Sequence, residues 1–86
     1  MLWDELQDVA DVLTLGAEKY DDTNYLKIDP YFDSHFAAAM RHLVAWRRGE
    51  KIDPETGVSS LAHAISRILF LMHGDKNVLK VVGPDR

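Results

Sequence analysis

The densest group of chemically active side chains lies between residues 41 and 63. It contains three acids, three arginines and two imidazoles: Arg41, His42, Arg47, Arg48, Glu50, Asp53, Glu55 and His63. A divalent cation such as Mg²⁺ takes oxygen ligands, commonly one or two carboxylates completed by water and substrate phosphates. Glu50 and Asp53 can supply that pair. A histidine in the same ligand set favours Mn²⁺, because imidazole is a poor ligand for the harder Mg²⁺.

The two histidines of this group also allow acid–base chemistry. A neutral imidazole, of His42 or His63, can orient or deprotonate a water nucleophile. On a helix, one further turn would bring Glu50 to within about 80° of His42. Each of these residues also has a possible structural role. Acidic residues in a short loop are usually only solvated, and Asp53 before Pro54 suits a turn. A histidine among apolar neighbours is more often a structural residue than a ligand.

A second polar group follows the first apolar segment of the chain. It consists of Lys19, Tyr20, Asn24 and Tyr25. Lys19 can neutralise a phosphate, while Asn24 and a tyrosine ring can contact a base by hydrogen bonding and stacking. Alternatively, Lys19 caps a helix, Asn24 forms a turn and the tyrosines pack in the interior.

The charge and the apolar runs of the chain exclude two classes of partner. The net charge of -4 is opposite to the basic surface that binds phosphate backbones, so we expect no binding to long nucleic acids. The longest apolar run, residues 68–72, is far shorter than the roughly 20 residues that span a bilayer. The N-terminus lacks the basic start of a signal peptide. We therefore expect a cytoplasmic protein that does not enter membranes.

The small size of the chain predicts self-association. A domain of 86 residues hides only about 60% of its unfolded surface. The chain has 47% hydrophobic residues and no cysteine, so disulfides cannot compensate for a thin core. We expect one domain over residues 1–86 that completes its core as a homo-oligomer, a dimer or higher.

Periodicity predicts an all-α domain with three main helices, assembling into an oligomeric helical bundle. The first helix covers residues 2–20, where apolar residues recur every three or four positions. The second begins at Asp33 or Ser34, turns Phe36, Met40 and Leu43 inward, and stops at Gly49. In it, the small residues 37–39 permit close approach of another helix or a ligand.

The third helix and the tail complete this prediction. Ser59 or Ser60 caps the helix, its apolar stripe runs from Leu61 to Met72, and Gly74 ends it. Residues 75–86 fit a short helix, a strand or an arm that reaches a neighbouring subunit.

Three stretches in register resemble a known family. They are VLTLGAEKY at residues 12–20 with Asn24-Tyr25 after it, AMRHL at residues 39–43 with Ala45-Trp46, and GEKIDPETG at residues 49–57 leading to LAHA at residues 61–64. This pattern, over about residues 8–72, resembles the small phage-encoded domains described as dATP/dGTP diphosphohydrolases. Those domains are similar to the MazG-type all-α NTP pyrophosphohydrolases.

The resemblance implies a reaction and a set of site residues. Water would attack a purine nucleoside triphosphate, dGTP or dATP, between the α- and β-phosphates, giving a monophosphate and pyrophosphate with the help of Mg²⁺ or Mn²⁺. By resemblance, such enzymes shape a phage's nucleotide pool, in the host cytoplasm. The roles assigned on this basis are metal binding for Glu50, Asp53 and His63, catalysis for these three and His42, phosphate binding for Lys19 and Arg41, and nucleoside binding for Asn24 and Tyr25.

The chain departs from the pattern of that family at several positions. The family has histidine at Ser60, asparagine at Arg67 and tryptophan at Tyr25. In the MazG-type motif, two acidic residues three apart begin the equivalent helix, whereas this chain has Ser60 and His63. A second hypothesis follows: a nucleotide-binding or helical interaction protein of the same fold that has lost catalysis.

Overall fold

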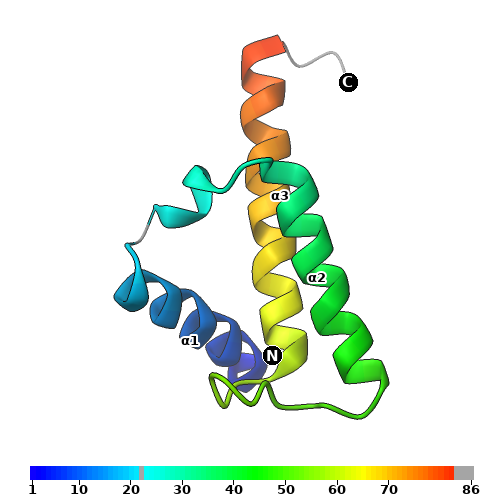
Figure 1. The fold of residues 1–86 in the computed structure, drawn as a ribbon. Coiled ribbons are helices and arrows are strands. Elements are labelled where there is room, and N and C mark those ends of the chain that lie inside the picture. Colours follow the sequence, from blue (N-terminus) through cyan, green and yellow to red (C-terminus); the bar gives the residue numbers. More distant parts are fainter. Residues whose placement is uncertain (22, 83–86) are drawn as a thin grey trace.

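The computed structural model describes residues 1–21 and 23–82, with side chains described up to residue 77. Within these residues the chain forms three α-helices and one short 3-10 helix (Figure 1). In chain order these are α1 (Trp3–Lys19), η1 (Asn24–Lys27), α2 (Tyr31–Arg47) and α3 (Ser60–Val82). The predicted all-α class with three main helices is confirmed.

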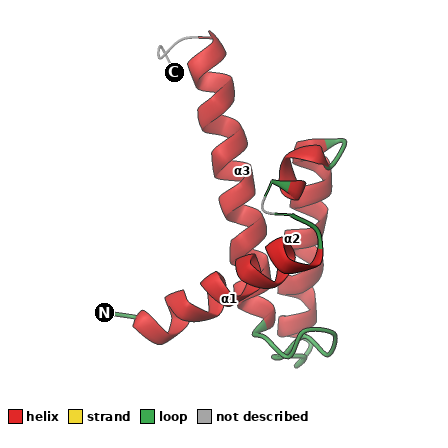
Figure 2. Ribbon diagram, turned by 90° about the vertical axis from the view of Figure 1, so that its left-hand side faces the viewer, coloured by secondary structure: helices red, strands yellow, loops and turns green. Residues whose placement is uncertain are grey.

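The helices α2 and α3 form an antiparallel pair through small side chains. They lie side by side, and α3 extends well beyond the start of α2, while α1 lies at an angle to this pair (Figures 1 and 2). Ala38 and Ala39 of α2 are 2% and 4% exposed, and Ala62 and Ala64 of α3 are 3% and 1% exposed. Because each alanine is a single methyl group, the two backbones approach closely. The close helix contact predicted for residues 37–39 is thus confirmed at two of those positions.

The prediction that Gly74 ends the third helix is wrong, because α3 continues to Val82. A Cβ atom at Gly74 would lie 2.7 Å from ring atoms of both Phe32 and Tyr31. The hydroxyl of Tyr31 also donates a hydrogen bond to the carbonyl oxygen of Phe70, one turn earlier. Gly74 therefore makes room for the start of α2 against α3. Residues 75–82 continue the helix, and residues 83–86 of the predicted tail lie outside the described residues.

The ends of the other helices follow local chemistry. The helix α2 starts at Tyr31, after Pro30, and not after a cap at Asp33 or Ser34. It stops as predicted before Gly49, whose φ of 103° favours glycine. Ser59 caps α3, since its hydroxyl accepts a hydrogen bond from the backbone N–H of Ala62 at 3.3 Å. Within the described residues, no helix has the length and apolar composition needed to cross a membrane.

The inner face of α2 differs from the predicted one. His35, Ala38 and Ala39 are its buried residues, whereas Phe36 and Met40, predicted to face inward, are 58% and 43% exposed. Positions 35, 38, 39 and 42 recur at helical spacing, so the face that packs also carries two histidines. This face leads directly to the polar site.

Candidate functional site

A cavity of about 880 Å³ lies where the three helices meet η1 and the loop between α2 and α3. Its volume is in the range of small-molecule sites. Seven of the residues predicted for the site line it: Lys19, Asn24, Tyr25, Arg41, His42, Asp53 and His63. The structure therefore brings together all the predicted site residues except Glu50.

The loop before α3 is a small hairpin that directs Asp53 toward the helix. The backbone N–H of Asp53 donates to the carbonyl of Val58 at 2.9 Å, and that of Ser60 donates to Lys51 at 2.9 Å. Gly57, with a φ of 75°, allows the chain to turn between these bonds. Asp53 also begins the turn itself, because its Oδ2 accepts from the backbone N–H of Thr56 at 3.2 Å. The structural role considered for Asp53 and its place at the cavity thus coexist.

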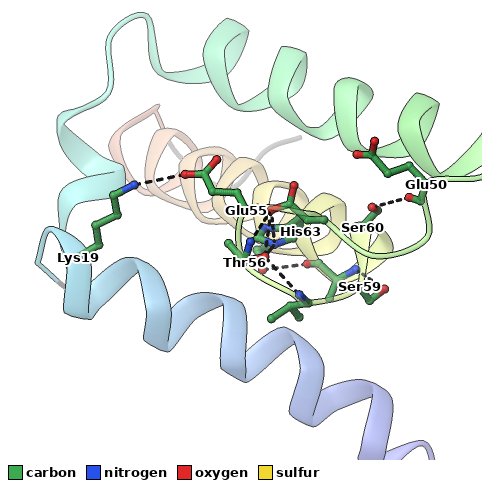
Figure 3. A network of polar contacts seen from close by, with 11 residues as sticks. Lys19, Glu50, Glu55, Thr56, Ser59, Ser60 and His63 are labelled. Carbon is green, nitrogen blue, oxygen red and sulfur yellow. Dashed lines mark hydrogen bonds and ion pairs between the residues drawn. The ribbon is translucent and has the colours of Figure 1, made fainter.

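Asp53, Thr56 and His63 form a chain of hydrogen bonds (Figure 3). The Thr56 hydroxyl lies 3.0 Å from Asp53 Oδ2 and 2.6 Å from His63 Nε2. A hydroxyl has one proton. When Thr56 donates it to the carboxylate, it must accept from Nε2–H of His63. In that arrangement Nδ1 carries the lone pair of the His63 ring.

The imidazoles of His42 and His63 stack on one another. Their ring centroids are 4.8 Å apart and the rings are inclined by 21°. Burial lowers the pKa of His63, against the opposing effect of the Asp53 carboxylate. Burial, and then repulsion from His63, lowers the pKa of His42. Both rings are therefore biased toward the neutral form, which can accept a proton.

His35 is fully buried and has two hydrogen-bond partners of opposite kind. Its Nδ1 lies 3.0 Å from Nη1 of Arg67, and its Nε2 lies 3.1 Å from the carbonyl oxygen of Tyr25. A guanidinium only donates and a carbonyl only accepts, so the ring must be the neutral tautomer with its proton on Nε2. Burial lowers the pKa of His35 and favours this same form.

Three cationic side chains, Lys19, Arg41 and Arg67, line the cavity. Lys19 lies 3.5 Å from Glu55 in an exposed ion pair. Hydrogen bonding to Tyr20 and then to Glu55 raises the pKa of Lys19. Burial, and then repulsion from Arg41, lowers the pKa of Arg67. The carboxylates of Asp21, Asp53 and Glu55 line the same cavity, so cationic and anionic groups share its wall.

The predicted nucleoside-binding residues come from the turn after α1. The backbone N–H of Asn24 donates to the carbonyl of Asp21 at 3.2 Å. A hydrogen bond from Lys27 lowers the pKa of the Asp21 carboxyl to about 2. Tyr25 stacks on Phe70 with ring centroids 4.4 Å apart and an angle of 7°. One face of the Tyr25 ring is therefore already covered, and the ring also makes a T-shaped contact with His73 at a centroid distance of 5.6 Å.

Glu50 is the predicted site residue that the single chain does not bring to the cavity. Its side chain is exposed, and Figure 3 shows it apart from His63. Its backbone carbonyl accepts a hydrogen bond from the Ser60 hydroxyl at 2.7 Å. That hydroxyl is buried and supports the loop, so Ser60 is a structural residue here.

Comparison with known proteins identifies the family. The sequence profile of the family described as dATP/dGTP diphosphohydrolase, N-terminal, matches residues 1–80. The chain belongs to this family. The resemblance derived from the three sequence stretches is confirmed.

The chain is also similar to a dATP/dGTP diphosphohydrolase of Salmonella phage PMBT28. It is 36% identical over 67 residues, which is 76% of this chain. The chain spans only 22% of that relative's length. No solved structure matches the chain.

The described residues of the chain contain no preformed cluster of three metal-ligating side chains. Such a cluster is not needed for Mg²⁺, which is often bound by one or two carboxylates and the substrate's phosphates. The hydrogen bonds of Asp53 at the site use Oδ2. Within the described residues this leaves Oδ1 for an ion, so the donor set fits a metal shared with the substrate.

Three residues of this family domain were missed by sequence reasoning: His35, Thr56 and Arg67. Arg67 lies four residues after His63, on the same helix face, and this spacing was a usable signal. His35 precedes His42 by seven residues, which also places both on one face. Thr56 follows Asp53 by three residues in a turn, but nothing in that spacing indicates its contact with His63.

Proposed function

We propose that this chain hydrolyses a purine (deoxy)nucleoside triphosphate, dGTP or dATP, to the monophosphate and pyrophosphate. The observation that carries the proposal is the bonded series of His63, Thr56 and Asp53 on the wall of a cavity that Lys19 and Arg41 also line. The family match and the name of the phage relative support the same substrates. Such an activity would shape the nucleotide pool in the cytoplasm of a phage-infected host.

In this proposal, His63 is the base. The Asp53 carboxylate and the Thr56 hydroxyl orient the ring through Nε2–H, while stacking on His42 limits its rotation. Nδ1 then accepts a proton from water as the water oxygen bonds to the α-phosphorus. The bond from that phosphorus to the α–β bridging oxygen breaks, and pyrophosphate leaves.

Binding of the substrate is divided between two sides of the cavity. Lys19 and Arg41 attract the phosphates, because charge-assisted hydrogen bonds are strong and guanidinium matches the phosphate geometry. Asn24 and Tyr25 contact the nucleoside. Asp53, together with the phosphates, would hold Mg²⁺ or Mn²⁺. The His63 ring would lie next to this ion. A bound ion supplies neutralisation of negative charge on the phosphates.

The decisive experiment is incubation with a panel of NTPs and dNTPs, with Mg²⁺, Mn²⁺ or a chelator, separating pyrophosphate from orthophosphate. We expect pyrophosphate from dGTP or dATP and none with the chelator. Asp53→Asn should lower kcat about 100-fold or more, since it removes the carboxylate that orients the base. Asp8→Asn, an exposed change of equal charge on α1, is the matched control and should be without effect.

Glu50→Gln separates the single-chain site from the predicted metal triad. Because Glu50 lies outside the cavity of the single chain, we expect its variant to stay within about threefold of the wild-type kcat, below the effect of a lost charge-assisted bond. A loss as large as that of Asp53→Asn would contradict this and place the Glu50 carboxylate in a site assembled from two chains.

A second function, nucleotide binding without turnover, is favoured by one observation. The buried Ser60 hydroxyl is used on the Glu50 carbonyl, so the position of the family's histidine supplies no ligand here. This alternative requires thermal stabilisation by nucleotides in the same panel with no product under either metal. Measurable pyrophosphate release rejects it.

A further inference from the structure

Arg67 is a half-buried charge whose hydrogen-bond partner is a neutral ring. Its Nη1 donates to His35 Nδ1 at 3.0 Å. Within the described residues, the ion pairs at or below 4.0 Å are formed by other groups, and no carboxylate lies that close to Arg67. A charge removed from water is normally paired, because desolvation is costly. Among the residues that the structure describes, no carboxylate is therefore close enough to form an ion pair with this guanidinium.

A second cation increases that cost. Arg41 lines the same cavity, and its repulsion is one cause of the lowered pKa of Arg67. Two cations held near each other repel until an anion neutralises both. Guanidinium groups donate through a planar fork that fits the oxygens of phosphate. An oligophosphate can accept hydrogen bonds from both arginines at once. A single small anion does this less well.

His35 fixes the orientation of Arg67 before a ligand arrives. The ring is 0% exposed, and its Nε2–H is anchored on the Tyr25 carbonyl at 3.1 Å. Its lone pair at Nδ1 therefore points in one direction, toward the guanidinium. Holding the donor in place in advance lowers the entropy that binding costs.

We propose that Arg67, positioned by His35, binds the phosphate chain of the ligand together with Arg41. The identity of the ligand as a nucleoside triphosphate rests on the proposed function, whereas the oligophosphate site does not need hydrolysis. The site should prefer tripolyphosphate and pyrophosphate to monophosphate.

Calorimetric titration of the full chain with tripolyphosphate, pyrophosphate and phosphate in a chelator tests this without turnover. We expect Arg67→Asn to weaken tripolyphosphate binding about tenfold to 100-fold, the equivalent of one or two charge-assisted hydrogen bonds. Arg67→Lys keeps the positive charge but lacks the planar fork of donors, so its affinity for tripolyphosphate should lie between those of the wild type and Arg67→Asn. Arg47→Asn removes the same charge from an exposed residue in the last turn of α2 and should bind as the wild type does.

The opposite results overturn the proposal. They are equal binding by Arg67→Asn and the wild type, equal losses in Arg67→Asn and Arg47→Asn, or no binding of tripolyphosphate to the wild type. If Arg67→Asn releases pyrophosphate at the wild-type rate, this inference is wrong, but the proposed function stands. If tripolyphosphate binding depends on Arg67 but the chain hydrolyses no nucleotide, the proposed function is wrong and this inference stands.

Two further measurements test the proposal even if the Arg67→Asn variant does not fold. In wild-type protein, the side-chain NMR signal of Arg67 should shift on addition of tripolyphosphate while that of Arg47 stays, and no shift at Arg67 overturns the proposal. His35→Asn keeps an acceptor atom where Nδ1 lies, while His35→Gln keeps a donor where Nε2 lies. We expect His35→Asn to bind tripolyphosphate more tightly than His35→Gln, and the reverse order contradicts the positioning role.

Discussion

The Thr56 hydroxyl connects the carboxylate and the imidazole of the site. Asp53 Oδ2 and His63 Nε2 are 3.6 Å apart, beyond a good hydrogen bond, whereas the hydroxyl lies within hydrogen-bond distance of both. The acid therefore acts on the base mainly through Thr56. A proton on Nε2 is then stabilised by a hydroxyl that is itself polarised by a carboxylate.

We expect Thr56→Val to lower kcat for pyrophosphate release about tenfold, because the variant leaves Nε2–H without its acceptor and a lost buried hydrogen bond costs about 1–3 kcal/mol. Valine keeps the shape of threonine, so the fold should persist, as a thermal melt would verify. Thr56→Ser retains the hydroxyl and should remain near the wild-type rate. Equal rates in Thr56→Val and Thr56→Ser would show that the hydroxyl does not orient the base.

At the residue scale, spacing predicted which side chains meet but not how they point. Asp53 and His63 were predicted to meet at the joint between the second and third helices, and the structure agrees. Glu50 belongs to the same loop, yet its side chain lies apart, since the direction of a loop side chain depends on backbone torsions that sequence spacing does not reveal. The direct contact of Thr56 with His63 depends on those same torsions.

Two glycines within helices have opposite environments. Gly16 lies inside α1, and a Cβ atom there would meet nothing within 4 Å. A Cβ atom at Gly74 of α3 would meet the rings of Tyr31 and Phe32 at 2.7 Å. The first glycine weakens its helix without a packing gain, while the second permits the contact of α2 with α3.

This contrast gives a matched pair of substitutions. We expect Gly74→Ala to lower the free energy of unfolding by about 1–3 kcal/mol, because two aromatic rings must move. Gly16→Ala should raise it by about 0.5–1 kcal/mol, through lower backbone entropy in the unfolded chain. Urea unfolding followed by circular dichroism measures both. The same sign for both variants would mean that helix propensity outweighs the Gly74 contact.

The element scale also shows where the hydrophobic pattern misleads. The helices themselves were predictable, and so was the Gly49 stop, because caps and periodicity are local. The buried face of α2 was not, since it is built from His35 and two alanines, while the larger Phe36 and Met40 point outward. A glycine that ends a helix and a glycine that admits an aromatic ring also look alike in one sequence.

The whole molecule exposes more surface than its mass requires. Its accessible surface is 6405 Å², whereas a compact monomer of 9.8 kDa exposes about 5,200 Å². The radius of gyration is 13.9 Å, against about 12 Å for a compact domain of this length. Large apolar side chains account for part of the exposed area, including Phe36 of α2 and Ile65 and Met72 of α3.

A second copy of this chain is the occupant we propose for this apolar surface. The excess of about 1,200 Å² over a compact monomer is comparable to the area that one partner buries in an ordinary protein interface, about 800 Å². Burying a large apolar side chain contributes about 1.5–3 kcal/mol. Self-association would therefore supply the stability that the small alanine core of the single chain does not.

Phe36→Ser tests this at one position of α2. In a twofold dimer the change removes two buried rings, so we expect the association constant to fall at least about 100-fold. Sedimentation velocity over a range of concentrations measures it. Ile52→Ser is the matched control, because Ile52 is 55% exposed and Phe36 58% exposed, yet Ile52 lies on the loop. Equal losses of association in both variants would mean that general surface apolarity, and not the face of α2 that carries Phe36, drives association. A wild type that stays monomeric at every concentration would contradict the proposal of a second copy as partner.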